Sequence, residues 1–347
     1  MALISRKKIP FKISPGLSTY LYKYQRAIEV PVEYGDLLRY DNSIPLYDNK
    51  GVDTLWETVF YPQDEMKDIQ FSLKKIYSVI KAAGDVEVME HLNIDRVDAC
   101  VYGNTRPFRV RIVNQVNDNF DYFYIKNADA SRIYGLELEH LLSPNRISYV
   151  VHKETLIEEH IAGIPGDQFI KHHMNDKGLN EIRLAKEFVK FNERCFVRLL
   201  GDMHSSNFVV NVIPDFEEIS YRIKAIDFDQ QSYEGRKNIY LPQYYKQNNP
   251  LIELGLRHMT PETVRQYQKE ERSLIANRLR VARYRVLDLI RTMINDTISF
   301  PKNVKQLKKE LTEFYGEPAF NDCKNMGEIV KVSLWMVLKK PDIYNIT

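Results

Sequence analysis

Cysteine is scarce in this sequence, and the cysteines present are not spaced to act together. Cys100, Cys195 and Cys323 lie far apart and form no CxxC motif. The sequence therefore predicts neither a zinc site of paired cysteines nor a disulfide framework. The simplest interpretation is a reducing compartment, so we expect a cytoplasmic location.

Long apolar runs and an excess of charge of one sign are also lacking. No run approaches the roughly 20 apolar residues that a membrane-spanning helix requires, and the N-terminal MALISRKKIPFKI lacks the apolar core of a signal peptide. The 49 Lys and Arg nearly balance the 47 Asp and Glu. We therefore expect neither membrane insertion nor a nucleic-acid partner. The basic segment Met1–Arg26 is interpreted as solvated surface, with an arm for an acidic partner as the alternative.

What the sequence does have is enough length and apolar content for two lobes. It has 347 residues, 44% of them hydrophobic, which suffices for a substantial buried core. Segment 94–162 contains short β-branched and aromatic stretches separated by turns, which predicts a small, mostly antiparallel sheet. Segment 163–347 is mainly helical in pattern, and segment 1–93 is expected to be an N-terminal extension or cap of mixed structure. The predicted fold class is therefore α+β with two lobes.

Four helices are predicted from hydrophobic periodicity and end signals. The first covers Lys67–Ala83, with Gly84 as its C-cap. The second, Ser131–Leu142, interrupts the sheet, and the third covers Leu179–Phe196. A Thr-Pro-Glu sequence at Thr260 supplies the N-cap, first-turn proline and acid of a fourth helix.

Two short polar clusters follow apolar runs in the helical half. The first is GDMHSSN, Gly201–Asn207, and the second, IKAIDFD, ends with Asp227 and Asp229 after a predicted strand hairpin. Phosphoryl transfer from ATP needs a carboxylate for the acceptor hydroxyl, oxygen ligands for Mg²⁺ and a cation on the phosphates. Asp202, Asn207 and Asp227 supply the first two of these requirements.

The sequence GDMHSSNFVV resembles the catalytic loop of the protein-kinase-like superfamily, particularly its aminoglycoside phosphotransferase and choline kinase branch. The pattern there is Gly-Asp-x-His-x-x-Asn, matched by Gly201, Asp202, His204 and Asn207. AIDFD resembles the metal-binding motif that follows the hairpin. The resemblance implies a bilobal protein-kinase-like fold with ATP and Mg²⁺ as cofactors. It implies Asp202 as catalytic base, Asn207 and Asp227 as Mg²⁺ ligands, and a bracing role for His204.

The chain departs from this branch at two positions. Ser205-Ser206 stands where Pro-Gly is common, and Leu200 stands where a His is frequent. The hairpin is also longer than usual, but no departure removes a catalytic group. Asp229 is expected either to assist the metal or to cap the following turn.

The resemblance also assigns roles within segment 94–162. Lys126, at the end of YFYIK, would bind the phosphates, and Glu137 on the following helix would orient it, with Glu139 as the alternative. The backbone of Glu159 and Ile161 would meet adenine at the inter-lobe hinge. The residues expected to contact the nucleotide are Gly103, Asn104, Thr105, Lys126, Glu159 and Ile161.

The expected activity is transfer of the γ-phosphate of ATP to a hydroxyl of a small-molecule acceptor. A protein serine/threonine kinase is the first alternative, because Thr260-Pro261-Glu262 lies where such kinases close their activation segment and a Tyr-rich stretch precedes it. An ATP-binding pseudokinase scaffold is the second. A metal hydrolase is less favoured, since the sequence offers no second well-spaced His beside His204. The sequence leaves the acceptor and the oligomeric state open.

Overall fold

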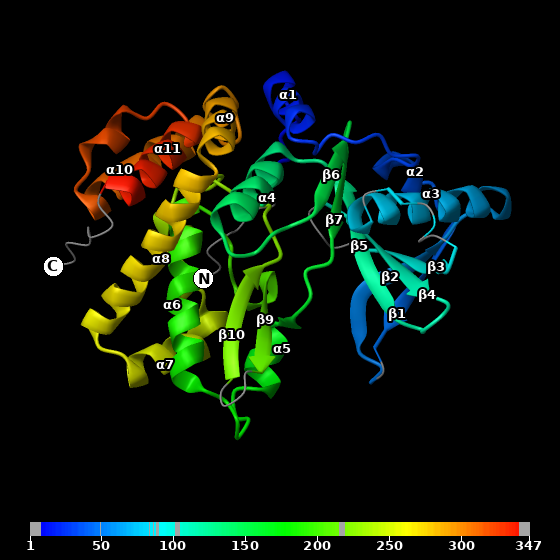
Figure 1. Cartoon of the computed structure of the whole chain (residues 1–347), viewed down its shortest axis with the longest axis horizontal. Coiled ribbons are helices and arrows are strands. Elements are labelled where there is room, and N and C mark those ends of the chain that lie inside the picture. Colours follow the sequence, from blue (N-terminus) through cyan, green and yellow to red (C-terminus); the bar gives the residue numbers. More distant parts are fainter. Residues whose placement is uncertain are drawn as a thin grey trace. The chain divides into compact units, whose positions relative to one another are not determined.

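The computed structural model describes residues 8–48, 50–82, 84–85, 87, 90–100, 105–214 and 219–339. It divides the chain into two compact units (Figure 1). The sheet unit comprises Lys12–Asp129 and Ile147–His160, and the helical unit comprises the described residues of Met1–Phe11, Ala130–Arg146 and Ile161–Thr347. The chain therefore passes from one unit to the other four times.

The sheet unit contains a seven-stranded antiparallel sheet in the order β1-β2-β3-β4-β5-β7-β6. Its strands are β1 Asn42–Tyr47, β2 Asp53–Phe60, β3 Leu92–Ala99, β4 Phe108–Asn114, β5 Phe120–Asn127, β6 Tyr149–His152 and β7 Thr155–Glu159. The described residues of segment 94–162 contain the predicted antiparallel sheet, and residues 101–104 of that segment lie outside the described residues. Because β2 pairs with β3 through Glu57↔Ala99 and Thr58↔Asp98, the structure places no domain boundary between segments 1–93 and 94–162. Residues 12–93 instead extend the predicted sheet.

One face of this sheet is covered by α3, Gln63–Lys81. Ile69, Leu73 and Ile76 of α3 share a buried cluster with Phe123 and Ile125 of β5. Since side chains alternate between the two faces of a strand, Tyr124 and Lys126 lie on the opposite face. The predicted helix is confirmed, but it begins at Gln63, ends at Lys81 and has Ala82 rather than Gly84 as its C-cap. Gly84 lies two residues further on, where it has a φ of +88° and its N–H donates to the Ser78 carbonyl over 3.0 Å. Two shorter helices, α1 Pro15–Lys23 and α2 Tyr34–Leu37, complete the unit.

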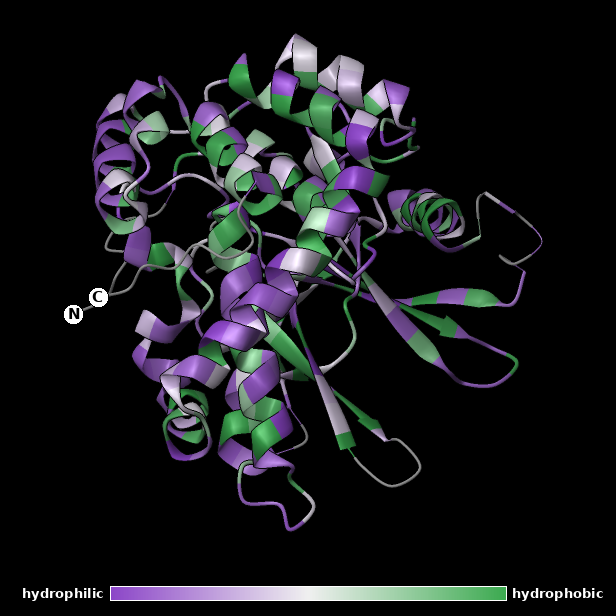
Figure 2. Cartoon of the chain, turned by 60° about the vertical axis from the view of Figure 1, so that its left-hand side comes forward, coloured by the Kyte–Doolittle hydropathy of each residue, from purple (hydrophilic) through white to green (hydrophobic). Residues whose placement is uncertain are grey.

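The helical unit contains a three-stranded sheet in the order β10-β9-β8. Its helices carry apolar and polar residues on different faces, visible as green and purple around the ribbons in Figure 2. The bounds are α4 Ala130–Leu142, β8 Ile164–Pro165, α5 Gly166–His172, α6 Glu181–Arg198, β9 Phe208–Pro214, β10 Ile219–Ala225, α7 Asn249–His258, α8 Pro261–Val281, α9 Arg283–Ile294, α10 Pro301–Tyr315 and α11 Met326–Lys339. Short 3₁₀ turns are η2 Ser205–Asn207, η3 Lys237–Tyr240, η4 Pro242–Tyr244, η5 Lys246–Asn248 and η6 Pro318–Asp322. Within the described residues, none of the helices has the length and apolar character needed to traverse a bilayer.

The predicted helix starting at Thr260 is confirmed as α8. The Thr260 hydroxyl accepts a hydrogen bond from the Thr263 N–H over 3.3 Å, and Pro261 fills the first turn. The predicted third helix is α6, in which Ala185, Phe188 and Cys195 are buried. The apolar periodicity of the segment also places Ile182 on this face, but Ile182, in the first turn of α6, is 53% exposed.

Gly327 allows α11 to pack directly on α9. A Cβ added at Gly327 would lie 2.5 Å from the carbonyl carbon and oxygen of Met293, and that backbone cannot yield. We expect Gly327→Ala to destabilise the fold by about 3 kcal/mol, the upper end for overpacking, measured by chemical denaturation. Gly255→Ala in α7 is the matched control, because its Cβ would meet nothing within 4 Å and should be neutral or slightly stabilising. Equal stability of the two variants would contradict this account of the α9–α11 contact.

Candidate active site

The two polar clusters of the sequence are brought together at one end of the β9–β10 hairpin. Helix α6 ends at Arg198, and its C-cap Leu199, with a φ of 55°, turns the chain into the GDMHSSN loop. The Leu199 carbonyl accepts from the Ser232 N–H over 2.8 Å, and the Gly201 N–H donates to the Gln230 carbonyl over 3.2 Å. The loop is thereby tied to the segment that follows the second cluster.

The backbone at Gly201 and Asp202 is held in a restricted conformation. A side chain at Gly201 would approach Ile239 Cγ2 to 2.9 Å and the Gln230 carbonyl to 3.1 Å, so this close approach favours glycine. Asp202 has a φ of 62°, in the left-handed region, and its N–H donates to the Ile239 carbonyl over 3.1 Å. Such a conformation costs on the order of 1 kcal/mol and clusters at functional sites. These backbone contacts therefore fix the position of the Asp202 Cα atom, from which the carboxylate side chain projects.

Asn207 and His204 stabilise the loop from inside. The Asn207 side-chain amide donates to the Asp202 carbonyl over 2.8 Å, so its nitrogen is committed and its oxygen is the atom left to act as a ligand. The Asn207 carbonyl accepts from the Ile226 N–H over 3.0 Å, which links the loop to the residue before Asp227. His204 Nδ1 accepts from the Ser206 N–H over 3.3 Å, and burial lowers the pKa of His204. The hydrogen bond to the Ser206 N–H is the contact through which His204 would brace the loop.

The Ser205-Ser206 departure forms the 3₁₀ turn η2, packed against the start of α5. Ser205 is buried, and a Cβ at Gly166 would lie 2.5 Å from the Ser205 carbonyl and 2.4 Å from Phe208 Cε2. The turn and α5 therefore meet backbone to backbone. The two serines therefore form a turn whose backbone packs against the first residue of α5.

Arg132, on α4, binds both acids of the second cluster. Its Nη1 donates to Asp227 Oδ1 and to Asp229 Oδ1, each over 2.7 Å, and Arg132 is 1% exposed. The Asp229 N–H also donates to Asp227 Oδ1, over 3.1 Å, and the Lys8 ammonium donates to the Asp229 carbonyl over 2.7 Å. The Asp227 side chain keeps 34% of its surface exposed against 13% for Asp229. Asp227 is therefore the better placed of the two to meet an incoming cation.

The pKa of Asp202 is raised to about 7, first by burial and then by the charges of Asp227, Asp229 and Glu234. Removing water disfavours the charged carboxylate, and nearby carboxylates disfavour it further. A carboxyl group with this pKa can accept a proton near neutral pH. The shift also indicates that the two polar clusters interact electrostatically.

A magnesium ion would find ligands here but no preformed cage. Within the described ranges, no group of three or more His, Cys, Asp or Glu is arranged to hold a metal ion. The Asp227 carboxylate and the Asn207 amide oxygen are the available pair. Mg²⁺ is usually held by one or two carboxylates together with waters and substrate phosphates. These residues therefore fit an ion that arrives with a nucleotide better than a resident structural ion.

The structure gives Lys126 and Glu137 partners other than the expected one. Lys126 Nζ donates to Glu158 Oε2 over 2.9 Å, within the sheet unit. Glu137 is held by Arg285 of α9 through three hydrogen bonds of 2.8–3.1 Å, and Glu139 pairs with Arg198 of α6. In the structure, each of these three residues thus has an ion-pair partner within its own unit, and the pairing of Lys126 with a helical glutamate stays a prediction.

Sequence reasoning missed Glu158 and Arg132. Glu158 lies directly opposite Tyr124 in the β5–β7 ladder, while Lys126 lies opposite Leu156, so Glu158 and Lys126 are diagonal neighbours on one sheet face. A charged residue inside the apolar stretch TLIEE was the available signal for Glu158. No local signal marks Arg132, because its acidic partners lie 95 and 97 residues away along the chain.

The remaining residues expected at the nucleotide are only partly placed. Gly103 and Asn104 lie outside the described residues. The Thr105 carbonyl accepts from the Tyr34 hydroxyl over 3.2 Å. The Glu159 N–H donates to the Ser148 carbonyl over 3.1 Å, which commits its backbone donor to the sheet. Ile161 opens the next stretch of the helical unit, so the adenine contacts of this segment stay predictions.

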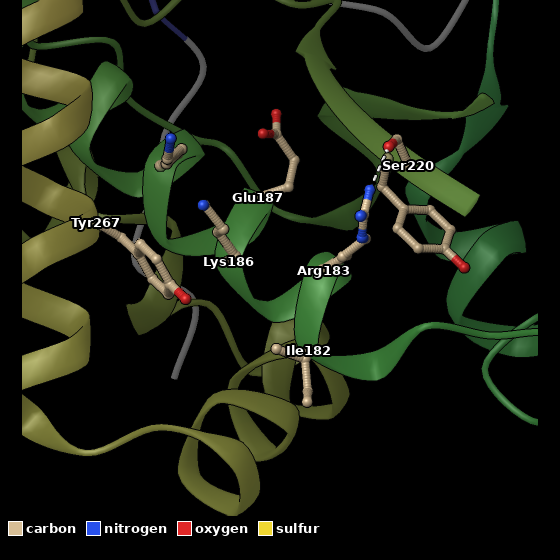
Figure 3. A pocket seen from close by; sticks show the side chains of 8 residues that line it. Ile182, Arg183, Lys186, Glu187, Ser220 and Tyr267 are labelled. Atoms are coloured by element: carbon tan, nitrogen blue, oxygen red, sulfur yellow. Dashed lines mark hydrogen bonds between the residues drawn. The ribbon is translucent and has the colours of Figure 1, made fainter. Parts of the chain in front are cut away.

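An open pocket of about 460 Å³ lies elsewhere in the helical unit, among α6, β10 and α8 (Figure 3). Lys190 and Lys186 at this pocket are 2.9 and 3.6 Å from Glu270, and Arg183 donates to the Ser220 hydroxyl over 2.9 Å. Its cations are therefore already balanced or bonded. None of the residues predicted for catalysis or nucleotide binding lines it.

Comparisons with known proteins do not define a family. No family model and no curated protein matches the sequence. Titin kinase with its flanking domains overlaps 73% of this chain and 48% of its own, at 14% identity and a TM-score of 0.28. The autoinhibited serine kinase domain of the giant muscle protein titin overlaps 71% of this chain and 93% of its own, at 12% identity and a TM-score of 0.28. The chain thus spans about half the length of the first. Overlaps this loose leave the aminoglycoside phosphotransferase and choline kinase branch a prediction.

Proposed function

We propose that this chain is an ATP- and Mg²⁺-dependent phosphotransferase of the kinase type that acts on a hydroxyl group. The observation that carries the proposal is the joining of Asp202, Asn207 and Asp227 at one end of the β9–β10 hairpin. Asn207 is hydrogen-bonded both to the Asp202 carbonyl and to the Ile226 N–H. These hydrogen bonds support the proposal, because they hold the proposed base, whose pKa is about 7, and the two proposed oxygen ligands in one loop system.

The proposed reaction assigns a proton transfer to Asp202. The ionised Asp202 carboxylate accepts the proton of the acceptor hydroxyl. At the same time, the oxygen of that hydroxyl forms a bond to the γ-phosphorus of ATP. The bond between that phosphorus and the β–γ bridging oxygen breaks, and ADP leaves. Asp227 and the amide oxygen of Asn207 would hold Mg²⁺, which when bound neutralises charge on the phosphates. Lys126 would contribute a second positive charge to the phosphates.

A small-molecule acceptor is the favoured substrate class. The sequence feature that most suggested a protein kinase was the Thr-Pro-Glu at Thr260. In the structure, Thr260 caps α8 through its hydroxyl and Pro261 occupies the first turn. Helix initiation therefore accounts for this feature without an activation segment. The catalytic-loop pattern, which resembles the small-molecule branch, then stands as the main guide to the acceptor.

Incubation of the purified chain with γ-labelled ATP and Mg²⁺ tests this proposal. Three sets of reactions should be compared: a panel of amino alcohols, aminoglycosides and sugars, a generic protein substrate, and the chain alone. We expect label in a small molecule of the panel. Label in the generic protein or in the chain itself would favour the protein kinase alternative. Failure of Mg·ATP to bind, measured by calorimetry, would overturn the proposal and favour a scaffold.

A further inference from the structure

We propose that Glu158, on strand β7, is the positioning residue for Lys126, in place of a glutamate on helix α4. The inference rests on the proposed phosphotransferase function and adds a residue to that site. Lys126 and Glu158 form an ion pair of 2.9 Å in which both residues are more than nine-tenths buried. A buried charge is retained in a protein when its partner is close and well oriented.

The sheet holds both members of this pair rigidly. Lys126 lies opposite Leu156 and Tyr124 lies opposite Glu158, so the pair spans two hydrogen-bonded neighbouring strands. The Lys126 ammonium also lies 5.4 Å from the centre of the Tyr124 ring, an attractive geometry for a cation. The Tyr124 hydroxyl is in turn 3.2 Å from His160 Nδ1. The lysine is therefore oriented by groups of its own sheet.

The helical glutamates are committed elsewhere. Arg285 holds Glu137 through both carboxylate oxygens, and Glu137 is fully buried. Arg198, itself 1% exposed, pairs with Glu139, which also accepts from the Asn145 side-chain amide. Turning Glu139 toward another cation would leave the buried Arg198 without its carboxylate, which is strongly unfavourable. Turning Glu137 away would break its three hydrogen bonds to Arg285, whose side chain is 23% exposed.

The grouping of α4 with the helical unit supports the same assignment. Lys126 belongs to the sheet unit, whereas Ala130–Arg146 belongs to the helical unit. A lysine that depended on α4 would be oriented by the other unit. A lysine held by Glu158 keeps its orientation whatever the position of α4. We therefore infer that residues of the sheet unit alone orient the Lys126 ammonium toward an anionic phosphate.

Glu158→Gln tests the assignment, because it keeps the shape of the side chain and removes its charge. We expect the KM for ATP and the Kd of Mg·ATP to rise at least about 10-fold, a change typical for loss of a buried charged partner. Glu158→Asp should recover part of this loss. In a Lys126→Met background, Glu158→Gln should cause no further rise, because the residue that it positions is gone. The Tm of each variant should be measured by circular dichroism, and all assays should be run well below it.

The controls separate this inference from its rivals. Glu57→Gln, at another partly buried strand glutamate of the same sheet, should leave the KM for ATP unchanged. A rise in KM for Glu137→Gln that exceeds the rise for Glu158→Gln would return the role to α4 and overturn the inference. Wild-type KM in a folded Glu158→Gln variant would also overturn it. The proposed function fails separately, if the wild-type chain neither binds Mg·ATP nor transfers phosphate.

Discussion

Replacement of Asp202 by asparagine is expected to remove phosphate transfer and to stabilise the fold above neutral pH. The amide cannot accept the hydroxyl proton, and general-base catalysis typically contributes 10²- to 10⁴-fold. We therefore expect a loss of about 10³-fold in turnover. The gain in stability arises because asparagine is never charged, whereas Asp202 lies buried beside Asp227 and Asp229.

The sign of the stability effect follows from the pKa of Asp202. Folding raises this pKa from 3.8 to about 7, so the folded state binds more protons than the unfolded state between these values. The stability of the wild type therefore falls as pH rises through that window. Below pH 4 the two proteins should be equally stable, and above pH 7 the variant should be more stable. Because a quarter of the side chain is exposed, we expect a gain on the order of 2 kcal/mol rather than the full linkage value.

Thermal unfolding from pH 4 to pH 8, with and without Mg²⁺, measures this difference. Mg²⁺ should reduce the advantage of Asp202→Asn, because the ion stabilises the ionised wild-type cluster. Asp176→Asn, at an exposed carboxylate of the same unit, should show no such pH-dependent gain. A gain that does not change with pH would mean that ionisation of Asp202 is not its cause. Turnover within 10-fold of the wild type would remove Asp202 from the proposed role of base.

Replacement of Asp227 by alanine is expected to remove Mg²⁺-dependent nucleotide binding. Loss of an outer-shell partner of a metal already costs 10- to 100-fold in affinity, so loss of a direct ligand should weaken Mg·ATP binding by at least about 100-fold. The fold should tolerate the change. Arg132 keeps its hydrogen bond of 2.7 Å to Asp229, so no buried guanidinium loses all of its carboxylates.

Calorimetric titration with ATP in Mg²⁺ and in EDTA isolates the role of the metal. The wild type and Asp227→Ala should differ in Mg²⁺ and bind ATP with the same low affinity in EDTA. Asp176→Ala serves as the matched control in both buffers. An equal difference in the two buffers would show that Asp227 affects ATP without a metal, and the assignment of Asp227 as a ligand would be wrong.

The sequence predicted those elements whose pattern is local. Strand β5 alternates buried Phe123 and Ile125 with Tyr124 and Lys126 on the opposite face, which is the period-two signal of a strand. Helix α8 was predicted from its N-cap and first-turn proline. Strands β1 and β2 were missed as part of the sheet because most of their residues are exposed or half-buried. Little apolar alternation marks them.

The site divides in the same way. The spacing of Asp202, Asn207 and Asp227 predicted a shared site, and the structure joins their two segments through backbone hydrogen bonds. The partners of the charged side chains depend instead on contacts between distant segments. Arg285 reaches Glu137 across 148 residues of chain, and no local spacing encodes such a pair. Sequence reasoning therefore found the chemical groups but not the counter-ions that hold them.

The hydrogen bond from Lys8 to the Asp229 carbonyl bears on how the chain is assembled during translation. The two residues are 221 positions apart, so Lys8 can form this hydrogen bond only after Asp229 has left the ribosome. The sheet unit, complete by His160, can fold in the meantime, since domains generally fold as units during synthesis. The segment Asp227–Asp229 therefore receives the hydrogen bond from Lys8 only after the β9–β10 hairpin has emerged from the ribosome. A bulky fusion placed directly before Lys8 would therefore disturb the segment Asp227–Asp229, although this segment lies more than 200 residues later in the sequence.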